Sequence, residues 1–266
     1  MKQLTKRQFR RYCDIVYSES GIKLNEQKRE LLNARIGKRI RKLNVQADKY
    51  LSIVEKDPIE LNLFLDAIST NHTYFFRESD SFKYLDQSCK NIWCAASSSG
   101  EEPYSLATYC LELGFTPSIL ATDISDSCLA KGRKGVYPKK CITNIPKNIL
   151  RRYFQKGQGK WEGHVKVKQS VSKLITFEKF NLLKDSPSSR IFDIIFCRNV
   201  MIYFDKPTKE AVLHKLVRVL KPGGYFIIGG SESLSSLNHS LKYIEPSVYK
   251  CADLDAMPNM TPYRAG

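Results

Sequence analysis

The sequence lacks the features that mark several large classes of protein. No run of 18 or more apolar residues occurs, so we expect no transmembrane helix. The basic residues 1–11 are not followed by an apolar stretch of about 7–15 residues, so we expect no secretory signal. Internal repeats and low-complexity segments are also absent. These absences favour a globular cytoplasmic protein with no direct membrane insertion.

The cysteines lack any spacing that would predict a disulfide scaffold or a metal site. Eight cysteines are scattered along the chain, none forms Cys-x-x-Cys, and no His/Cys cluster has zinc-ligand spacing. Several lie within apolar runs, which is typical of small core side chains. We expect reduced thiols and no bound metal.

Positive charge is abundant and uneven. The formal net charge is +16, and residues 1–56 hold 15 Lys and Arg against 6 Asp and Glu. Such an excess implies an anionic partner, which could be nucleic acid, a membrane surface or an acidic protein. Charge alone does not choose among the three.

Residues 1–68 predict a basic helical domain. In residues 28–43, apolar side chains recur at helical spacing and would fill one face. Five cations fall on an adjoining arc, which is either a solvated face or a docking surface. They are Lys28, Arg35, Lys38, Arg39 and Lys42.

From residue 91 the pattern changes to alternating strands and helices, which predicts a doubly wound parallel sheet within residues 69–266. The expected strands are 92–96, 118–122, 191–197, 225–228 and a possible edge strand at 248–251, and the expected helices are 103–113, 127–134 and 208–220. Residues 139–172 interrupt the alternation. Their glycines and the alternating Val165, Val167 and Val171 predict a small inserted antiparallel β-subdomain. We expect the tail after residue 252 to be loose.

The turn after the first strand favours a cationic ligand over a phosphate. The G-x-G-x-x-G fingerprint is absent, and Glu101 and Glu102 stand at the start of the following helix. S-adenosylmethionine carries an ammonium and a sulfonium and no phosphate, so carboxylates there suit it. The alternative is that both glutamates only complement the helix dipole.

Polar residues also follow the later strands. Asp123 comes about 20 residues after the glycine turn, where an acid that binds ribose hydroxyls is expected. Helix capping could explain Asp126 but not Asp123. Asn181 follows residues 175–180, a further expected strand, and could read an adenine edge or form an Asx turn. Arg198 and Asn199 end an apolar strand, where ligands of open α/β sheets bind, although they could be only a polar strand exit.

These motifs together resemble the chemotaxis receptor methyltransferases of the CheR type, in the family's order and over nearly the whole chain. The similar segments are 70–78 (TNHTYFFRE), 96–105 (ASSSGEEPYS), 122–124 (TDI), 181–183 (NLL), 197–205 (CRNVMIYFD) and 220–224 (LKPGG). The last is shared by many methyltransferases, whereas the Asn-x-Thr-x-Phe-Phe-Arg and Cys-Arg-Asn-Val-Met-Ile-Tyr-Phe runs are specific. Ser98-Ser99 departs mildly from the more usual Ser-Thr.

The resemblance implies a class I methyltransferase that uses S-adenosylmethionine to esterify glutamates on the cytoplasmic helices of chemoreceptors. It implies that Arg77 and Tyr203 lie nearest the reacting groups. The cofactor contacts that it implies are Asn71, Thr73, Arg77, Glu101 or Glu102, Asp123, Asn181, Leu182, Arg198 and Asn199. It also implies a monomer whose β-subdomain, around Gly157 and Gly159, could grip a receptor's C-terminal tail, or could be only a solvated hairpin.

Two other functions compete with this interpretation. The charge suggests a nucleic-acid methyltransferase, but the Asn/Asp-Pro-Pro-Tyr/Phe motif of adenine enzymes and the Pro-Cys of cytosine C5 enzymes are absent. A binding module that has lost catalysis is the second, and the presence of Arg77, Asp123 and Tyr203 argues against it.

Overall fold

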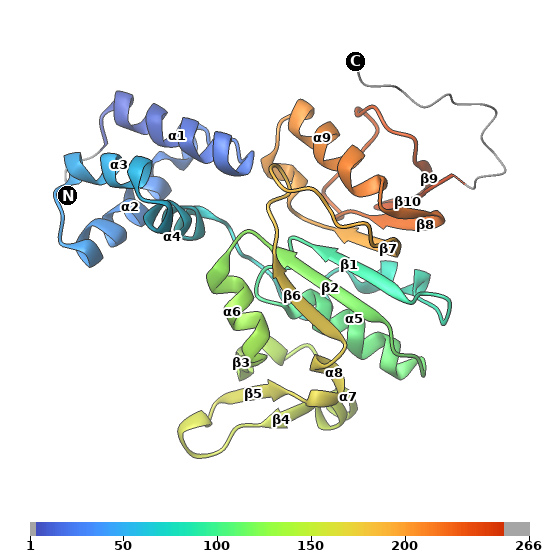
Figure 1. The fold of residues 1–266 in the computed structure, drawn as a ribbon. Helices are drawn as coiled ribbons and strands as arrows, with labels where there is room; N and C mark the ends of the chain where they lie inside the picture. The colour runs from blue at the N-terminus through green and yellow to red at the C-terminus, as the bar shows by residue number, and fades with distance from the viewer. Residues whose placement is uncertain (1–3, 253–266) are drawn as a thin grey trace.

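The computed structural model describes residues 4–252, which form a helical N-terminal part and a larger α/β part (Figure 1). The predicted loose tail lies outside the described residues. The N-terminal part contains α1 (Lys6–Ser20), α2 (Arg29–Leu43), α3 (Ala47–Lys56) and α4 (Pro58–Ile68), with a 3-10 turn at Glu26–Lys28. Its core includes a cluster of aromatic rings, in which the Tyr12 and Phe64 centroids lie 5.4 Å apart.

Local sequence signals set the ends of these helices. Thr5 and Gln8 form a capping box at the start of α1, and Gly21 ends it in the left-handed conformation with φ +73°. Asp57 caps α4, whose first residue is Pro58.

The predicted arc of five cations on α2 is wrong in part. Arg39 is buried and pairs with Glu60 of α4, which also accepts a hydrogen bond of 2.6 Å from the Tyr50 hydroxyl. Arg35 is half-buried and donates to the carbonyl oxygens of Ala67 and Ser69. Two of the five cations therefore join α2 to α4, and the other three are exposed. The sequence pattern did not show that an acid from α4 would reach this arc.

The α/β part is built on a seven-stranded sheet of order β6-β2-β1-β7-β8-β10-β9. The first five strands in this order are parallel to their neighbours, whereas β10 pairs antiparallel with both β8 and β9. The strands are β1 (Asn91–Ala95), β2 (Ser118–Asp123), β6 (Ile175–Lys179), β7 (Phe192–Cys197), β8 (Leu220–Ile227), β9 (Lys242–Glu245) and β10 (Val248–Lys250). The strand predicted at 248–251 is thus not at the edge, because β9 lies outside it.

Helices cover both faces of the sheet (Figure 1). On one face, α5 (Glu101–Glu112) and α6 (Asp126–Lys134) pack with Phe82 and Phe196 in a large apolar cluster. On the other, α9 (Lys206–Val217) packs against Trp93 and Phe226 in a second cluster. The predicted doubly wound sheet is confirmed.

The helix predicted at 208–220 ends earlier than expected. It begins at Lys206 and ends at Val217, and Leu220 already starts β8, which runs through Pro222-Gly223-Gly224. A Cβ on Gly224 would lie 2.7 Å from the Asp193 carbonyl oxygen of β7, and the β7–β8 register shifts nearby. The glycine pair that looked like a helix stop therefore allows a bulge and a close approach of two strands.

The predicted β-subdomain is a three-stranded antiparallel sheet of order β3-β5-β4. It comprises β3 (Val136–Pro138), β4 (Phe154–Lys156) and β5 (His164–Val167), with α7 (Lys147–Tyr153), α8 (Gln169–Ser172) and 3-10 turns at Lys139–Ile142 and Gly159–Trp161. Figure 1 shows it on the side of the main sheet away from α9. Val165 and Val167 are in a strand as predicted, but Val171 lies in α8, where its side chain is fully buried.

Candidate functional site

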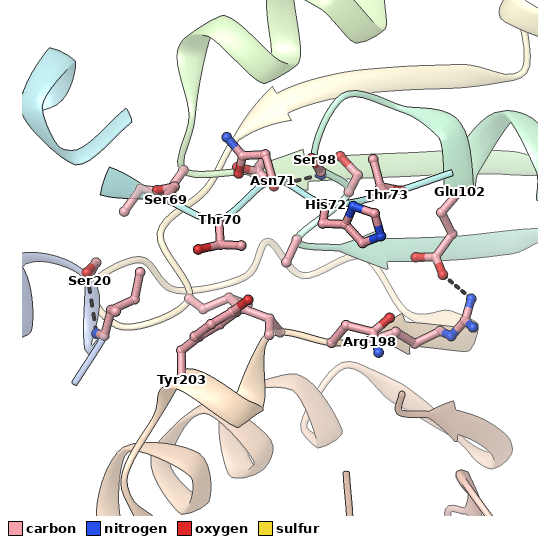
Figure 2. A pocket seen from close by; sticks show the side chains of 18 of the residues that line it. Ser20, Ser69, Thr70, Asn71, His72, Thr73, Ser98, Glu102, Arg198 and Tyr203 are labelled. Atoms are coloured by element: carbon pink, nitrogen blue, oxygen red, sulfur yellow. Dashed lines mark hydrogen bonds and ion pairs between the residues drawn. The ribbon is translucent and has the colours of Figure 1, made fainter. Parts of the chain in front are cut away.

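A cavity lies at the carboxyl ends of β1, β2 and β7, under the helical part of the chain. In the sheet, β1 has β2 on one side and β7 on the other, so the strand order reverses there, which is where open α/β sheets bind ligands. The cavity measures about 930 Å³ with its solvent-open space included. Figure 2 shows linker residues Thr70, Asn71 and His72 on one side, with Arg198 and Tyr203 on the other.

Most of the residues predicted from the sequence come together here. The predicted residues that line the cavity are Asn71, Thr73, Arg77, Glu102, Asp123, Asn181, Leu182, Arg198, Asn199 and Tyr203. Glu101 is not among the lining residues. Its buried carboxylate accepts a hydrogen bond of 2.6 Å from the Ser99 hydroxyl and lies 3.6 Å from Lys131 Nζ. The structure therefore separates the two glutamates that the sequence could not tell apart.

The turn between β1 and α5 brings the backbone close to the cavity. Ala96, Ser98 and Gly100 have φ values of +61°, +49° and +93°, and Ala96 and Ser98 line the cavity. Residues with short side chains suit such a turn because they let a ligand approach the main chain. This turn takes the place of the missing glycine fingerprint.

Asp123 joins this turn to the end of β2. Its Oδ2 accepts the Ser98 N–H at 2.7 Å and its Oδ1 accepts the Ser125 N–H at 2.9 Å. A carboxylate has about four lone-pair sites, so Asp123 can still accept a ligand hydroxyl. Burial raises the pKa of Asp123 above its ordinary value, although hydrogen bonds from the backbone N–H groups of Ser125, Ser98 and Ile124 act in the opposite direction. These features fit the ribose of an adenosine.

An ion-pair network forms another wall of the cavity. Arg198 pairs with Glu102, and its Nη2 donates to Glu78 Oε2 at 3.0 Å and to the Arg77 carbonyl oxygen at 2.8 Å. Glu102 also accepts a hydrogen bond of 2.9 Å from the Cys94 thiol. Both terminal nitrogens of Arg198 are therefore occupied by protein groups, and the arginine holds Glu102 and the chain at Arg77 in place. Glu102 lines the cavity, so its charge suits a ligand ammonium.

Glu78 completes this network. Burial alone would raise the pKa of Glu78, but the Gly230 N–H and the charge of Arg198 outweigh it, so the pKa lies below its ordinary value. The Gly230 N–H donates to Glu78 Oε2 at 2.8 Å, and Asn199 Nδ2 lies 3.4 Å from Oε1. Glu78 therefore stays ionised and ties together three segments that are distant in sequence.

Asn181 lines the cavity, but its amide is occupied by protein groups. Its Oδ1 accepts the N–H groups of Leu183 and Lys184, which is the Asx turn that the sequence left open as an alternative. Its Nδ2 donates to the Glu19 carbonyl oxygen of α1 at 2.7 Å. This amide thus joins the helical part of the chain to the rim of the sheet, and Leu182 next to it supplies an apolar wall.

Arg77 and Tyr203 stand in the same cavity on different segments. Arg77 Nη1 donates to the His72 carbonyl oxygen at 2.9 Å, and its guanidinium lies over the Tyr74 ring, 5.7 Å from the centroid. Tyr203 ends the 3-10 turn Met201–Tyr203, and its carbonyl oxygen accepts the Lys23 N–H at 2.9 Å. Tyr203 also lines a second, adjoining groove.

Sequence reasoning missed the contribution of the helical part to the cavity. Ser20 and Ile22, at the end of α1, line it together with linker residues Ser69 and Thr70. The only sequence signal for Ser20 and Ile22 was Gly21, which marks a helix end but not where that end docks, whereas Thr70 begins the similar segment 70–78. In the structure a Cβ on Gly21 would lie 2.8 Å from Thr208 Cγ2 of α9, so the contact needs this glycine.

Within the described part of the chain, no helix is long and apolar enough to cross a membrane. The same residues contain no cluster of three or more His, Cys, Asp or Glu that could hold a metal ion.

Two family models together match most of the chain. A family model described as "CheR methyltransferase, SAM binding domain" matches residues 71–250, and one described as "CheR methyltransferase, all-alpha domain" matches residues 7–69. The chain belongs to the CheR methyltransferase family. It is therefore a methyltransferase with an S-adenosylmethionine-binding domain, which matches residues 71–250.

Curated relatives agree with this assignment. The chain is 38% identical over 272 residues to "Chemotaxis protein methyltransferase" of Borreliella burgdorferi, covering 93% of this chain and 95% of the relative. It is 38% identical over 255 residues to the protein of the same name in Salmonella typhimurium, covering 91% and 88%. It is 36% identical over 263 residues to "Chemotaxis protein methyltransferase 2" of Pseudomonas aeruginosa, covering 93% and 94%.

Proposed function

We propose that this CheR family member transfers a methyl group from S-adenosylmethionine to glutamate side chains on the cytoplasmic helices of chemoreceptors. The names of the relatives place those proteins in chemotaxis, and the chemistry of the site supports a carboxylate acceptor here. The product would be a glutamate methyl ester, which removes one negative charge from the receptor helix. We infer that the enzyme acts in the cytoplasm as a monomer.

A groove that opens beside the cofactor cavity is the observation that carries this proposal. Three residues, Ile22, Thr70 and Tyr203, line both hollows, so they adjoin one another. The other groove residues come from the helical part and include three cations. They are Lys23, Leu24, Lys28, Leu31, Leu32, Arg35 and Ile68. Apolar side chains with cations among them suit an amphipathic helix that carries glutamates.

Methyl transfer to a carboxylate requires little acid–base catalysis from the protein. A glutamate with an ordinary pKa of about 4.3 is already ionised at pH 7, so the attacking oxygen needs no general base. The cofactor, when bound, supplies a methyl group activated by its positive sulfur. The chain must hold the carboxylate in line with that methyl group, and such alignment can contribute roughly 7–11 kcal/mol to lowering the barrier.

We assign the roles of the site residues on this basis. Glu102 would hold the cofactor ammonium, Asp123 the ribose hydroxyls, and Leu182 with Asn181 the adenine side of the cavity. Arg77 and Tyr203 would orient the acceptor carboxylate by hydrogen bonds without neutralising it. Asn71, Thr73, Arg198 and Asn199 would complete the cofactor wall, with Arg198 acting through Glu102.

The β-subdomain offers a second contact with the receptor. Its sheet has β4 at one edge, where the exposed Gln155 and Lys156 precede Gly157. A Cβ on Gly157 would lie 2.1 Å from the Trp161 carbonyl oxygen, and Trp161 is 51% exposed. We propose that a receptor tail peptide adds as a strand at this sheet, using main-chain hydrogen bonds. Equal binding of receptors with and without the tail would leave the subdomain a purely structural role.

Radiolabelled methyl transfer tests the main proposal. The enzyme and labelled cofactor are incubated with a purified receptor cytoplasmic fragment, the same fragment with its methylation-site glutamates replaced by alanine, or an oligonucleotide duplex. We expect label only in the first, and we expect alkaline hydrolysis to release it, because a methyl ester is cleaved and an amine-linked methyl group is not. Label in the oligonucleotide would instead favour a nucleic-acid methyltransferase.

A further inference from the structure

A carboxylate outside both hollows joins the loops that follow β7 and β8. Glu232 Oε2 accepts the backbone N–H groups of Asn199 at 2.9 Å and Gly229 at 2.7 Å, and its Oε1 accepts the N–H of Ile202 at 3.1 Å. The Glu232 N–H in turn donates to the Gly229 carbonyl oxygen at 2.9 Å. One side chain therefore joins two loops that are 30 residues apart in sequence, at the carboxyl ends of β7 and β8.

The loop that Glu232 holds carries residues of the reacting end. Asn199 has a φ of +57°, a left-handed conformation that asparagine tolerates better than most residues with a side chain. Two residues later the 3-10 turn Met201–Tyr203 begins, and the Tyr203 N–H donates to the Val200 carbonyl oxygen at 3.1 Å. Without an acceptor at Glu232, the N–H groups of Asn199 and Ile202 would lose the partner that fixes this path.

The two loops also touch directly. A Cβ on Gly229 would lie 2.3 Å from Asn199 Nδ2, so only glycine leaves room for the asparagine side chain. A shift of the β8 loop would therefore move Asn199, because there is no free space between them. Asn199 lines the cofactor cavity and Tyr203 lines both the cavity and the groove, whereas Glu232 is absent from the described lining of either.

We propose that Glu232 is a positioning residue for methyl transfer: it holds the loop from Asn199 to Tyr203 so that these two side chains face the donor and the acceptor. A carboxylate suits this task because three N–H donors converge on it. The amide of a glutamine would turn an NH₂ group toward at least one of them. The assignment rests on the proposed function only where it refers to the acceptor.

A carboxylate at the amino ends of the strands of the same sheet provides a matched control. Asp193 Oδ2 accepts the backbone N–H groups of Lys90 at 2.8 Å and Asn91 at 2.9 Å, so it also joins two neighbouring strands. It does so at the amino ends of β1 and β7, away from the cavity. Asp193→Asn therefore disturbs strand-to-strand hydrogen bonds without touching the Asn199–Tyr203 loop.

The first measurement is the single-turnover rate of methyl transfer to the receptor fragment at saturating cofactor. We expect Glu232→Ala to slow it by about 10²-fold, the effect of a displacement of about 1 Å, with little change in the KM for the fragment. Glu232→Gln should fall between the parent and the alanine variant, and Asp193→Asn should keep the parental rate. Combined with Tyr203→Phe, Glu232→Ala should lose less than the product of the two separate effects, because both act on one loop.

The second measurement needs no acceptor. Hydrogen–deuterium exchange of the Asn199 and Ile202 amides should speed up in Glu232→Ala and not in Asp193→Asn. A folded Glu232→Ala variant with parental rate and parental exchange would overturn the proposal, as would an equal slowing by Asp193→Asn. If the parent itself transfers no methyl group to the receptor fragment, the proposed acceptor is wrong, and the exchange at these two amides alone decides the role of Glu232.

Discussion

Arg198, at the end of β7, forms a buried ion pair with Glu102, in the first turn of α5. The Arg198 side chain is only 2% exposed, and it also holds Glu78 and the backbone at Arg77. Removal of the arginine would leave the Glu102 and Glu78 carboxylates without their cation, and the Glu102 side chain is only 13% exposed. The pair therefore links the shape of the cofactor wall to the stability of the fold.

This relationship predicts the effect of Arg198→Met, which keeps the volume of the side chain but not its charge. The variant should lose about 3–5 kcal/mol of unfolding free energy, because breaking a buried ion pair leaves a charge uncompensated. Urea denaturation measures this loss. Arg152→Ala, which breaks an exposed pair with Glu112, should change stability little. Similar midpoints for both variants would contradict the prediction.

Asp123→Ala should weaken cofactor binding. The loss should be about 1.5–3 kcal/mol, the usual contribution of hydrogen bonds to a charged group. Isothermal calorimetry with S-adenosylhomocysteine measures it, with circular dichroism to verify folding. Asp126→Ala, three residues later on the exposed start of α6, is the matched control and should bind normally. An unchanged affinity in folded Asp123→Ala would remove this carboxylate from the site.

Tyr203→Phe and Arg77→Ala should lower turnover more than stability. Both side chains line the cavity and neither belongs to the buried core. The single-turnover rate at saturating cofactor and the thermal midpoint should be measured on the same samples. Tyr243→Phe, at an exposed position of β9, is the control and should leave both unchanged. Parental rates in the two site variants would refute a role near the reacting groups, and Arg77→Ala should also raise the dissociation constant of the cofactor.

The exposed cations of the N-terminal part should steer acidic receptor helices toward the groove. Arg39 and Arg35 are unsuitable for this test because they join α2 to α4, so the exposed Lys28 and Lys38 take their place. Lys28→Glu with Lys38→Glu should slow receptor methylation and flatten its dependence on ionic strength, because charge steering acts on the encounter rate.

The control for that pair carries the same change in net charge at a distance from the groove. Lys90→Glu with Lys242→Glu replaces two exposed lysines of the main sheet region. Cofactor affinity should stay at the parental value in both double variants. Equal rates for the two, or a parent enzyme insensitive to salt, would show that Lys28 and Lys38 do not steer the receptor.

Glu78 should contribute to the loss of stability in acid. Its folded pKa lies below the ordinary value of 4.5, so the folded state favours the ionised carboxylate. The stabilisation is present above the ordinary pKa and is lost as the pH falls through the lower folded value. Denaturation at neutral pH and below pH 4 (about half a unit under the ordinary pKa) should show a smaller loss for Glu78→Gln than for the parent. Glu30→Gln, at an exposed site on α2, should follow the parent.

Much of the fold and part of the site could be predicted from the sequence, because both depend on local patterns. Helical spacing in residues 28–43 reflects the burial of one face of a helix. The apolar runs that alternate with helices after residue 91 reflect strands that are buried on both faces. The polar residues at 123, 181, 198 and 199 come where predicted strands end, and parallel strands bring their ends to one edge. The tail after residue 252 stays a prediction.

The tertiary structure alone decided how distant segments share groups. It placed Glu60 against Arg39, so an apparent docking face became in part an internal contact. It assigned Glu102 to the cavity and Glu101 to Ser99, although the two are adjacent in sequence. It also brought Glu232 to the N–H groups of Asn199 and Ile202. Hydrogen bonds and ion pairs act over a few ångströms in space. The partner of a charged side chain therefore depends on how the elements pack, and the spacing of residues along the sequence does not predict that partner.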